Sequence, residues 1–196
     1  STLEVLDIAT RQRRIVRRAR EHFEAPNWTG DGQLIYNSGG RLYRIPAGGG
    51  TPAVIDTGER IRCNNDHGLS PDGKWLAFTG AEEGPQEVFT IPSQGGPVQR
   101  LTFQGSRTTV LGWRGDRIVF SSAYGQPNRQ PPWLYSIALD GTGLERLSYG
   151  PADRFHESGK TVVLGRKMRR FAEWKRYRGG TAGEIYIDVL GDGAFK

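Results

Sequence analysis

Four segments of the sequence share one plan: a short strand, a polar turn that contains glycine, and an apolar strand. They are NWTGDGQLIY (27–36), GLSPDGKWLAF (68–78), GWRGDRIVF (112–120) and FHESGKTVV (155–163). The same place in these units is taken by Trp28, Leu69, Trp113 and His156, at spacings of 41, 44 and 43 residues. A period in the low forties is typical of β-propellers, in which each repeat forms one four-stranded blade.

A second hairpin follows each unit and completes four strands. These hairpins lie in RLYRIPAGGGTPAVID, EVFTIPSQGGPVQRLT, WLYSIALDGTGLERLS and EIYIDVLGDGAFK. An aromatic residue recurs two places into each first strand: Tyr43, Phe89, Tyr135 and Tyr186. The sequence therefore predicts an all-β fold, a β-propeller of four-stranded antiparallel blades, with about four to five blades in a single domain over residues 1–196.

The turns carry the residues that tight hairpins need. In PDG at 71–73, proline fixes φ, aspartate bonds to the turn backbone and glycine accepts a positive φ. Large apolar side chains at one phase of the repeat fill the space between blades. We therefore expect Trp28, Leu69 and Trp113 to be packed between neighbouring blades.

The N-terminal segment LEVLDIATRQRRIV (3–16) is typical of another outer hairpin, placed before the first repeat. Propellers usually close by joining strands from both termini in one blade, which removes exposed strand edges. We therefore expect residues 3–16 to pair with the blade near 155–190. The strand count leaves two arrangements open: four blades with one strand to spare, or five blades of which two are incomplete. Self-association through the incomplete terminal blades is the alternative to pairing within the chain.

Two parts of the chain resemble different propeller families. In residues 1–104, HFEAPNW, IYNSGGRLYRIPAGGG and CNNDHGLSPDGKWLAF resemble TolB-like proteins. In residues 105–196, VLGWRGDRIVFSS, LYSIALDGTGLERLS and EWKRYRGGTAGEIYI resemble the N-terminal six-bladed propeller of tricorn proteases. The double resemblance implies a hybrid, an engineered propeller or a fragment of another member. Because the catalytic residues of tricorn-type enzymes lie in domains beyond the propeller, it also implies a binding module without the protease.

Composition excludes several other classes. The chain has one cysteine, Cys63, so an intrachain disulfide bond is excluded. No run of about 18 apolar residues predicts a membrane span, and no signal peptide is recognisable. Since the sequence starts at Ser1 and its one methionine is Met168, we expect a processed or excised product. The sequence does not decide the cellular compartment, because TolB-like relatives are periplasmic and tricorn-like relatives are cytoplasmic.

The stretch RIRCNNDHG (60–68) places a thiol, an acid and an imidazole close together. Neighbouring residues on an extended segment point in alternating directions, whereas cysteine catalysis needs converging groups and zinc needs about four ligands. We therefore predict no catalytic residue, no metal site and no cofactor. Aligned on the repeat, residues 61–67 connect an outer strand to the inner strand that starts near Gly68, at the mouth of the central channel. Asn65, Asp66 and His67 are candidate ligand contacts there; turn capping by their side chains is the alternative.

Positive charge gathers in RQRRIVRRAR and in GRKMRRFAEWKRYRGG, and the net charge is +6. The second stretch fills the long loop between the second and third strands of the last unit. Lys175, Arg176 and Arg178 alternate there with aromatic residues and are further candidate contacts at the channel face, for a peptide carboxylate or a phosphate. A solvated basic loop is the alternative. Nucleic-acid binding is disfavoured, since no known module is present.

Three hypotheses remain. The first is a non-catalytic propeller that binds a protein or peptide at the central-channel face. The second is a structural or engineered propeller without a specific ligand. The third, a hydrolase or lyase that uses the channel, has the least support from the residues.

Overall fold

The computed structural model describes residues 1–58, 61–127, 132–166 and 183–196. All regular secondary structure in these residues is β-strand, as the repeat predicts. The strands form five antiparallel sheets: β1 (Thr2–Leu6) and β2 (Arg13–Arg18); β3 (Glu24–Trp28), β4 (Gln33–Ser38), β5 (Arg41–Pro46) and β6 (Ala53–Ile55); β7 (Arg62–Leu69), β8 (Trp75–Ala81), β9 (Glu87–Pro92) and β10 (Gln99–Arg100); β11 (Thr108–Arg114), β12 (Arg117–Ser122), β13 (Trp133–Ala138) and β14 (Glu145–Pro151); β15 (Arg154–Ser158), β16 (Thr161–Arg166) and β17 (Glu184–Asp188).

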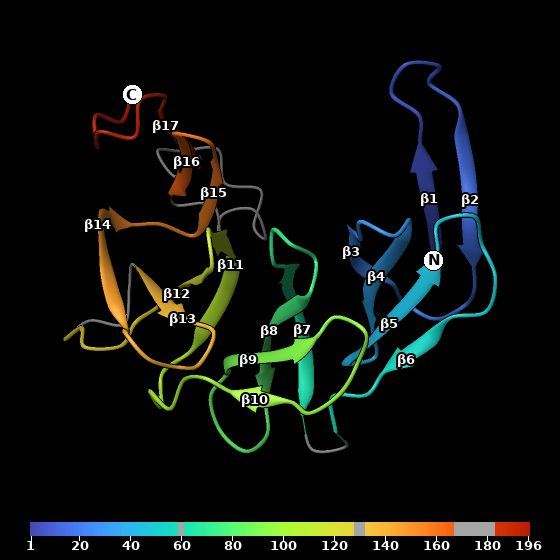
Figure 1. The fold of residues 1–196 in the computed structure, drawn as a ribbon, viewed down its shortest axis with the longest axis horizontal. Coiled ribbons are helices and arrows are strands. Elements are labelled where there is room, and N and C mark those ends of the chain that lie inside the picture. Colours follow the sequence, from blue (N-terminus) through green and yellow to red (C-terminus); the bar gives the residue numbers. More distant parts are fainter. Residues whose placement is uncertain (59–60, 128–131, 167–182) are drawn as a thin grey trace, which may run out of the picture.

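Four of these sheets are the blades of a β-propeller, and they follow one another around an arc (Figure 1). Within each blade the strands lie side by side in chain order. The first strands of successive blades contact each other, β3 with β7, β7 with β11 and β11 with β15, so these strands line the inside of the arc. In the fourth blade, the backbone of Lys196 pairs with that of Ile187 at the place of an outer strand (N to O distances of 2.9 and 3.0 Å).

The N-terminal hairpin is a separate two-stranded sheet. The expectation that it pairs with the C-terminal blade is wrong, because in the described residues β1 pairs with β2, and β17 with β16. Leu3 and Val16 instead pack against apolar residues of the first blade, including Leu34 and Tyr36. This burial holds the hairpin at one end of the arc, while β15–β17 form the other end (Figure 1).

Neighbouring blades pack face to face, so the second and third blades each have one face against the blade before and the other against the blade after. We call the side that meets the following blade the forward face, and the opposite side the backward face. Forward-face residues of the second and third strands are fully buried in the first three blades: Ile35 and Leu42, Ala77 and Val88, and Val119 and Leu134. They contact backward-face residues of the following blades, among them Leu76 and Phe78, Ile118 and Phe120, and Val162 and Leu164. Burial of each Val, Leu, Ile or Phe side chain in these faces stabilises the fold by about 1.5–3 kcal/mol.

The recurring aromatic residues lie in these backward faces. In three blades the aromatic residue of the third strand stacks on one of the second strand, with ring centroids 5.5–5.7 Å apart: Tyr43 on Tyr36, Phe89 on Phe78, and Tyr135 on Phe120. In the fourth blade Tyr186 pairs with Leu164 instead. The predicted aromatic repeat is therefore part of the packing between blades.

Packing of the repeated large residues between blades is confirmed at two of three positions. Leu69 packs against the core between the first two blades, and Trp113 packs between the second and third. The Trp113 indole also donates from Nε1 to the carbonyl oxygen of Gly68 in the preceding inner strand (2.9 Å). The expectation is wrong for Trp28, which is 58% exposed. The sheet before Trp28 has two strands, β1 and β2, and among the described residues no inner strand of a preceding blade covers the indole.

The predicted turn chemistry is present at 70–75. Ser70 Oγ donates to Asp72 Oδ1 (2.6 Å) and accepts from the backbone nitrogen of Trp75 (3.0 Å). Gly73 has a φ of 72°, a conformation that favours glycine. This turn fixes the register between β7 and β8.

Two glycines of the second blade differ in the space around them. A Cβ added at Gly80 would lie 2.7 Å from Ile61 Cγ2, whereas one added at Gly68 would meet nothing within 4 Å. We expect Gly80→Ala to lower the free energy of unfolding by about 1–3 kcal/mol through overpacking, and Gly68→Ala to change it little. Urea denaturation of both variants measures this. Equal effects would show that the core around Gly80 accommodates a methyl group.

Candidate functional site

One face of the propeller carries the loops between second and third strands and the connections from each outer strand to the next inner strand. The antiparallel strand order places both sets of connections at the same ends of the blades. We call this side the loop face. The boundary predicted for the connection at 61–67 is wrong, because β7 begins at Arg62. Asn65, Asp66 and His67 therefore lie within an inner strand, whose pairing with β8 is irregular between Cys63 and His67.

His67 is buried between the inner strands of the first two blades. Asn27 of β3 donates from Nδ2 to His67 Nδ1 (3.0 Å), which places the imidazole proton on Nε2. Nε2 is buried and has no hydrogen-bond partner among the described residues. Burial lowers the pKa of His67 to about 4, so the ring is neutral near pH 7. With 8% of its surface exposed, His67 belongs to the packing between the two blades.

Half-buried polar side chains surround this position. Asn64 Oδ1 accepts from the backbone nitrogen of Asp66, and Asn64 Nδ2 donates to Asp66 Oδ2, both at 2.6 Å. Asn65 bonds to the carboxylate of Glu24, which also pairs with His22 (3.1 Å). These two contacts, that from Asn65 being the larger, lower the pKa of Glu24. The structure thus brings Asn65 together with a carboxylate of the first blade, whereas Asp66 bonds to Asn64 of its own strand.

Cys63 has the surroundings of a core residue. Its side chain is 6% exposed and belongs to the apolar cluster between the first two blades. Sγ lies 3.5 Å from Thr57 Oγ1, and burial raises the pKa of the thiol. A thiolate is therefore disfavoured at this position. Within the described ranges, no group of three His, Cys, Asp or Glu side chains is arranged to hold a metal ion.

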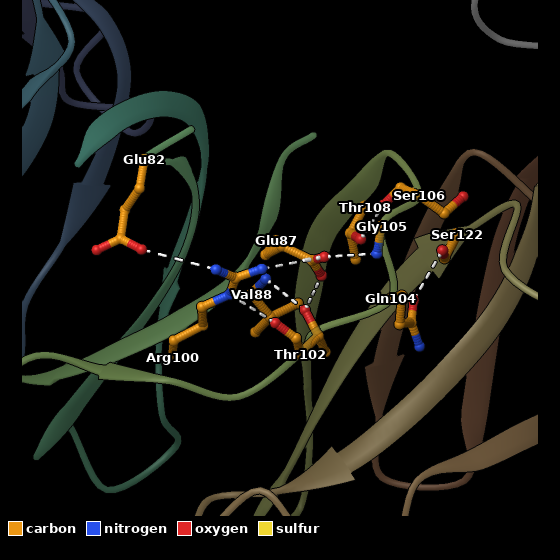
Figure 2. A network of polar contacts seen from close by, with 10 residues as sticks. All are labelled: Glu82, Glu87, Val88, Arg100, Thr102, Gln104, Gly105, Ser106, Thr108 and Ser122. Atoms are coloured by element: carbon orange, nitrogen blue, oxygen red, sulfur yellow. Dashed lines mark hydrogen bonds and ion pairs between the residues drawn. The ribbon is translucent and has the colours of Figure 1, made fainter. Parts of the chain in front are cut away.

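A buried carboxylate holds the connection between the second and third blades (Figure 2). Glu87 begins β9 and is 2% exposed. Its carboxylate accepts from Thr102 Oγ1 and from the backbone nitrogen of Gly105 (2.9 Å), and pairs with Arg100 Nη2 (3.4 Å). Arg100 also pairs with Glu82 of the preceding loop (3.6 Å). Since these donors compensate the burial of the charge, the network ties two stretches of the loop face to one strand.

A cavity of about 300 Å³ lies between the third and fourth blades. Its lining residues are Ser148, Tyr149, Arg166, Tyr186, Gly193 and Phe195. Arg166 ends β16 at the loop face. Its guanidinium lies over the ring of Tyr186, 4.5 Å from the centroid, and Nη2 donates to the carbonyl oxygen of Tyr149 (2.7 Å). Arg166 Nε is buried, without a hydrogen-bond partner in the part of the chain that the structure describes.

The aromatic walls of this cavity are packed against each other. The rings of Tyr149 and Phe195 meet edge to face, with centroids 5.5 Å apart. Tyr186 Oη donates to Glu184 Oε2 (2.9 Å) at the start of β17. The cavity therefore combines a positive charge with apolar ring surface, a combination that suits a carboxylate or carbonyl attached to an apolar group.

Sequence reasoning missed the cavity and the Glu87 network. Arg166 belongs to the basic stretch GRKMRRFAEWKRYRGG, and Tyr186 belongs to the aromatic repeat. No sequence signal places Tyr149 or Phe195 beside them, because these contacts depend on how the fourth blade packs. For Glu87, the one available signal is an acidic residue two places before a repeated aromatic.

Comparison with known proteins identifies the family of this chain. The sequence pattern of the tricorn protease N-terminal beta propeller domain matches residues 23–196. This chain belongs to that family. Tricorn protease homolog 1 of Streptomyces coelicolor is 40% identical over 160 residues, which are 80% of this chain and 14% of that protein. The chain thus spans about a seventh of that relative's length.

Two solved structures resemble the fold closely. A TolB-type protein from Agrobacterium tumefaciens superposes with a TM-score of 0.78 at 31% identity, over 98% of this chain and 67% of that one. The tricorn protease crystal structure superposes with a TM-score of 0.77 at 26% identity, over 90% of this chain and 18% of that one. Both resemblances noted in the sequence are therefore confirmed. The division of the chain at residue 104 stays a prediction.

Part of the predicted site of this tricorn-type propeller cannot be placed. Lys175, Arg176 and Arg178 lie in 167–182, outside the described residues.

The described part contains no helical segment with the length and apolar character of a membrane span.

Replacement of Cys63 tests its role as a core residue. We expect Cys63→Ala to leave the fold intact and to lower the free energy of unfolding by about 1 kcal/mol, because a small apolar group is lost from a packed cluster. Denaturant unfolding measures this loss. In the native wild type, the buried thiol should react with a disulfide reagent much more slowly than in the unfolded chain. Fast native labelling would contradict the core assignment.

The stability of the propeller should depend on pH through His67. In the unfolded chain His67 binds a proton below its ordinary pKa of 6.5. In the folded chain it stays neutral down to about pH 4. As the pH falls from about 6.5 to about 4, the free energy of unfolding should therefore decrease, by up to about 3 kcal/mol from this residue. We expect His67→Gln to remove this pH-dependent part of the free energy of unfolding, while the exposed control His156→Gln keeps it. Identical pH profiles of unfolding for both variants would refute the assignment.

Proposed function

We propose that this chain is a non-catalytic β-propeller module that binds a protein or peptide at its loop face, on the side of the central channel. The observation that carries the proposal is the cavity around Arg166. A guanidinium that lies over the ring of Tyr186, beside Tyr149 and Phe195, is suited to a peptide carboxylate or backbone carbonyl next to an apolar side chain.

The polar groups near the first two blades support a binding role on the same face. Glu24, Asn65 and Asp66 are half-buried side chains that can exchange hydrogen bonds with an extended chain crossing the inner strands. Each of them already bonds within the protein, Asn65 to Glu24 and Asp66 to Asn64, so a ligand must compete with these bonds. These residues are therefore assigned a secondary part in the proposed site, and the Arg166 cavity the primary one.

The relatives support a peptide as the ligand class. They are named as proteases, and the matching region is their N-terminal propeller. A propeller in a protease is exposed to the peptide chains on which that enzyme acts. Cys63, the most reactive residue type in the predicted stretch, is buried with a raised pKa, which argues against a hydrolase built on it.

A pair of peptides tests the proposal. The probe is a short peptide that ends in phenylalanine with a free carboxylate, and its control is the same peptide as the C-terminal amide. Isothermal titration calorimetry should show binding that is about tenfold weaker for the amide, because one charge-assisted hydrogen bond is lost.

Matched arginine variants locate the contact. Arg166→Gln should weaken binding of the carboxylate peptide about tenfold and should make the two peptides bind alike. Arg154→Gln, on the exposed start of β15, should leave the affinity unchanged. Thermal melting checks that both variants remain folded. Absence of binding by the folded wild type would favour a structural module without this ligand, and equal losses in both variants would favour unspecific attraction by positive charge.

A further inference from the structure

The last residue of β17 differs from its counterparts in the other blades. Two places after the recurring aromatic residue, the first three blades have an isoleucine: Ile45, Ile91 and Ile137. These isoleucines are buried in the apolar clusters between neighbouring sheets. The fourth blade has Asp188 at this place, and Asp188 is 1% exposed. A carboxylate thus occupies a buried position that belongs to the apolar core in the other blades.

Backbone groups of the following turn bond to the Asp188 carboxylate. Oδ1 accepts from the backbone nitrogens of Leu190 (3.1 Å) and Gly191 (2.8 Å), and Oδ2 accepts from that of Gly193 (2.8 Å). Burial alone would raise the pKa of Asp188, but these backbone donors outweigh burial and the pKa is lowered. The side chain is therefore an anion around which the backbone after β17 is folded.

The turn around Asp188 lies close to the rest of the fourth blade. Gly191 and Gly193 have φ values of 70° and 86°, in the left-handed region that favours glycine. A Cβ added at Gly191 would lie 2.8 Å from the carbonyl oxygen of Lys160, in the turn between β15 and β16. The backbone that Asp188 organises is therefore tightly folded against its own blade.

Two residues after this turn line the cavity between the third and fourth blades: Gly193 and Phe195. The Phe195 ring packs against Tyr149, and the backbone nitrogen of Phe195 donates to the carbonyl oxygen of Gly193 (3.1 Å). Asp188 thus holds Gly193 directly and Phe195 through one further hydrogen bond. Arg166 belongs to β16, whose pairing with β17 does not involve these bonds. The charged and the apolar parts of the cavity therefore have separate supports.

We infer that Asp188 is a positioning residue of this cavity, which holds Gly193 and Phe195 as its apolar wall and so sets its preference for an apolar side chain. For the ligand, the inference rests on the proposed function, in which Arg166 takes a peptide carboxylate. The placement of the wall is a property of the protein without ligand. Freeing the wall should therefore reduce selectivity for the apolar group and leave the preference for a carboxylate unchanged.

Two substitutions separate positioning from stability. Asp188→Asn keeps one side-chain oxygen for Leu190 and Gly191, but presents an NH₂ group instead of an acceptor to the Gly193 nitrogen. Asp188→Ile restores the residue type of the other blades and removes all three bonds. We expect Asp188→Ile to melt at or above the wild-type temperature, because an apolar side chain replaces a buried charge. If one variant melts early, the other carries the measurements.

Amide hydrogen exchange and NMR test the placement of the wall without a ligand. In the wild type, the Gly193 amide should be protected and the rings of Phe195 and Tyr149 should show a nuclear Overhauser contact. Both variants should lose this contact, and their Gly193 amide should exchange about tenfold faster. In Asp188→Asn the Gly191 amide should stay protected. An unchanged Gly193 amide and ring contact in the folded variants would overturn the inference.

Peptide binding tests the selectivity. The probes are the phenylalanine-terminated peptide, its C-terminal amide and the same peptide ending in alanine, measured by calorimetry. The wild type should prefer phenylalanine to alanine about tenfold and the variants about twofold, while all keep about tenfold preference for the acid over the amide.

The matched control is Asp140→Asn, in the turn after β13, where Asp140 Oδ1 accepts from the backbone nitrogen of Thr142 (2.9 Å). This variant should keep both preferences. Asp188 variants that retain the full preference for phenylalanine would overturn the inference. A wild type that binds none of the peptides would contradict the proposed function, and the role of Asp188 in placing the wall is then decided by the exchange measurement.

Discussion

Burial between neighbouring blades is the interaction on which the rest of this structure depends. Each sheet has two apolar faces, and in the first three blades the forward-face side chains are removed from solvent by the next sheet. A single blade would expose both faces, so the stability of each is shared with its neighbours, as in other repeat architectures. The connections, the polar networks and the cavity occupy positions that this packing defines.

The features that could be predicted from the sequence are those that the repeat itself encodes. The period, the turn at 71–73 and the phase of Tyr43, Phe89 and Tyr135 follow from side chains that every blade needs, and all are present. The start of β7 was misplaced because irregular pairing between Cys63 and His67 interrupts the strand alternation. The exposure of Trp28 could not be read from its own unit, since it depends on which strands the preceding sheet contains.

The candidate site was less predictable, for a related reason. Asn65, Asp66 and His67 were predicted as candidate ligand contacts, which stays a prediction. The partners of Asn65 and His67, Glu24 and Asn27, come from the previous blade. Glu87 and Arg166 obtain their surroundings from chain segments more than ten residues away. A repeat predicts that blades are neighbours. Which polar atoms then meet across the seam depends on side chains that differ from blade to blade, and these differences carry no periodic signal.

The fourth blade differs from the other blades on both sides of its sheet. On its backward side, Arg166 reaches the carbonyl oxygen of Tyr149 in the third blade, and the cavity lies in that seam. On its forward side, Ile185 and Ile187 are exposed where the preceding blades are covered. Because adjacent residues of a strand point to opposite faces, a substitution at Ile185 leaves the side chains of the cavity unchanged, and one at Arg166 leaves the apolar face unchanged. The cavity and the exposed apolar face are therefore physically separable features of the same blade.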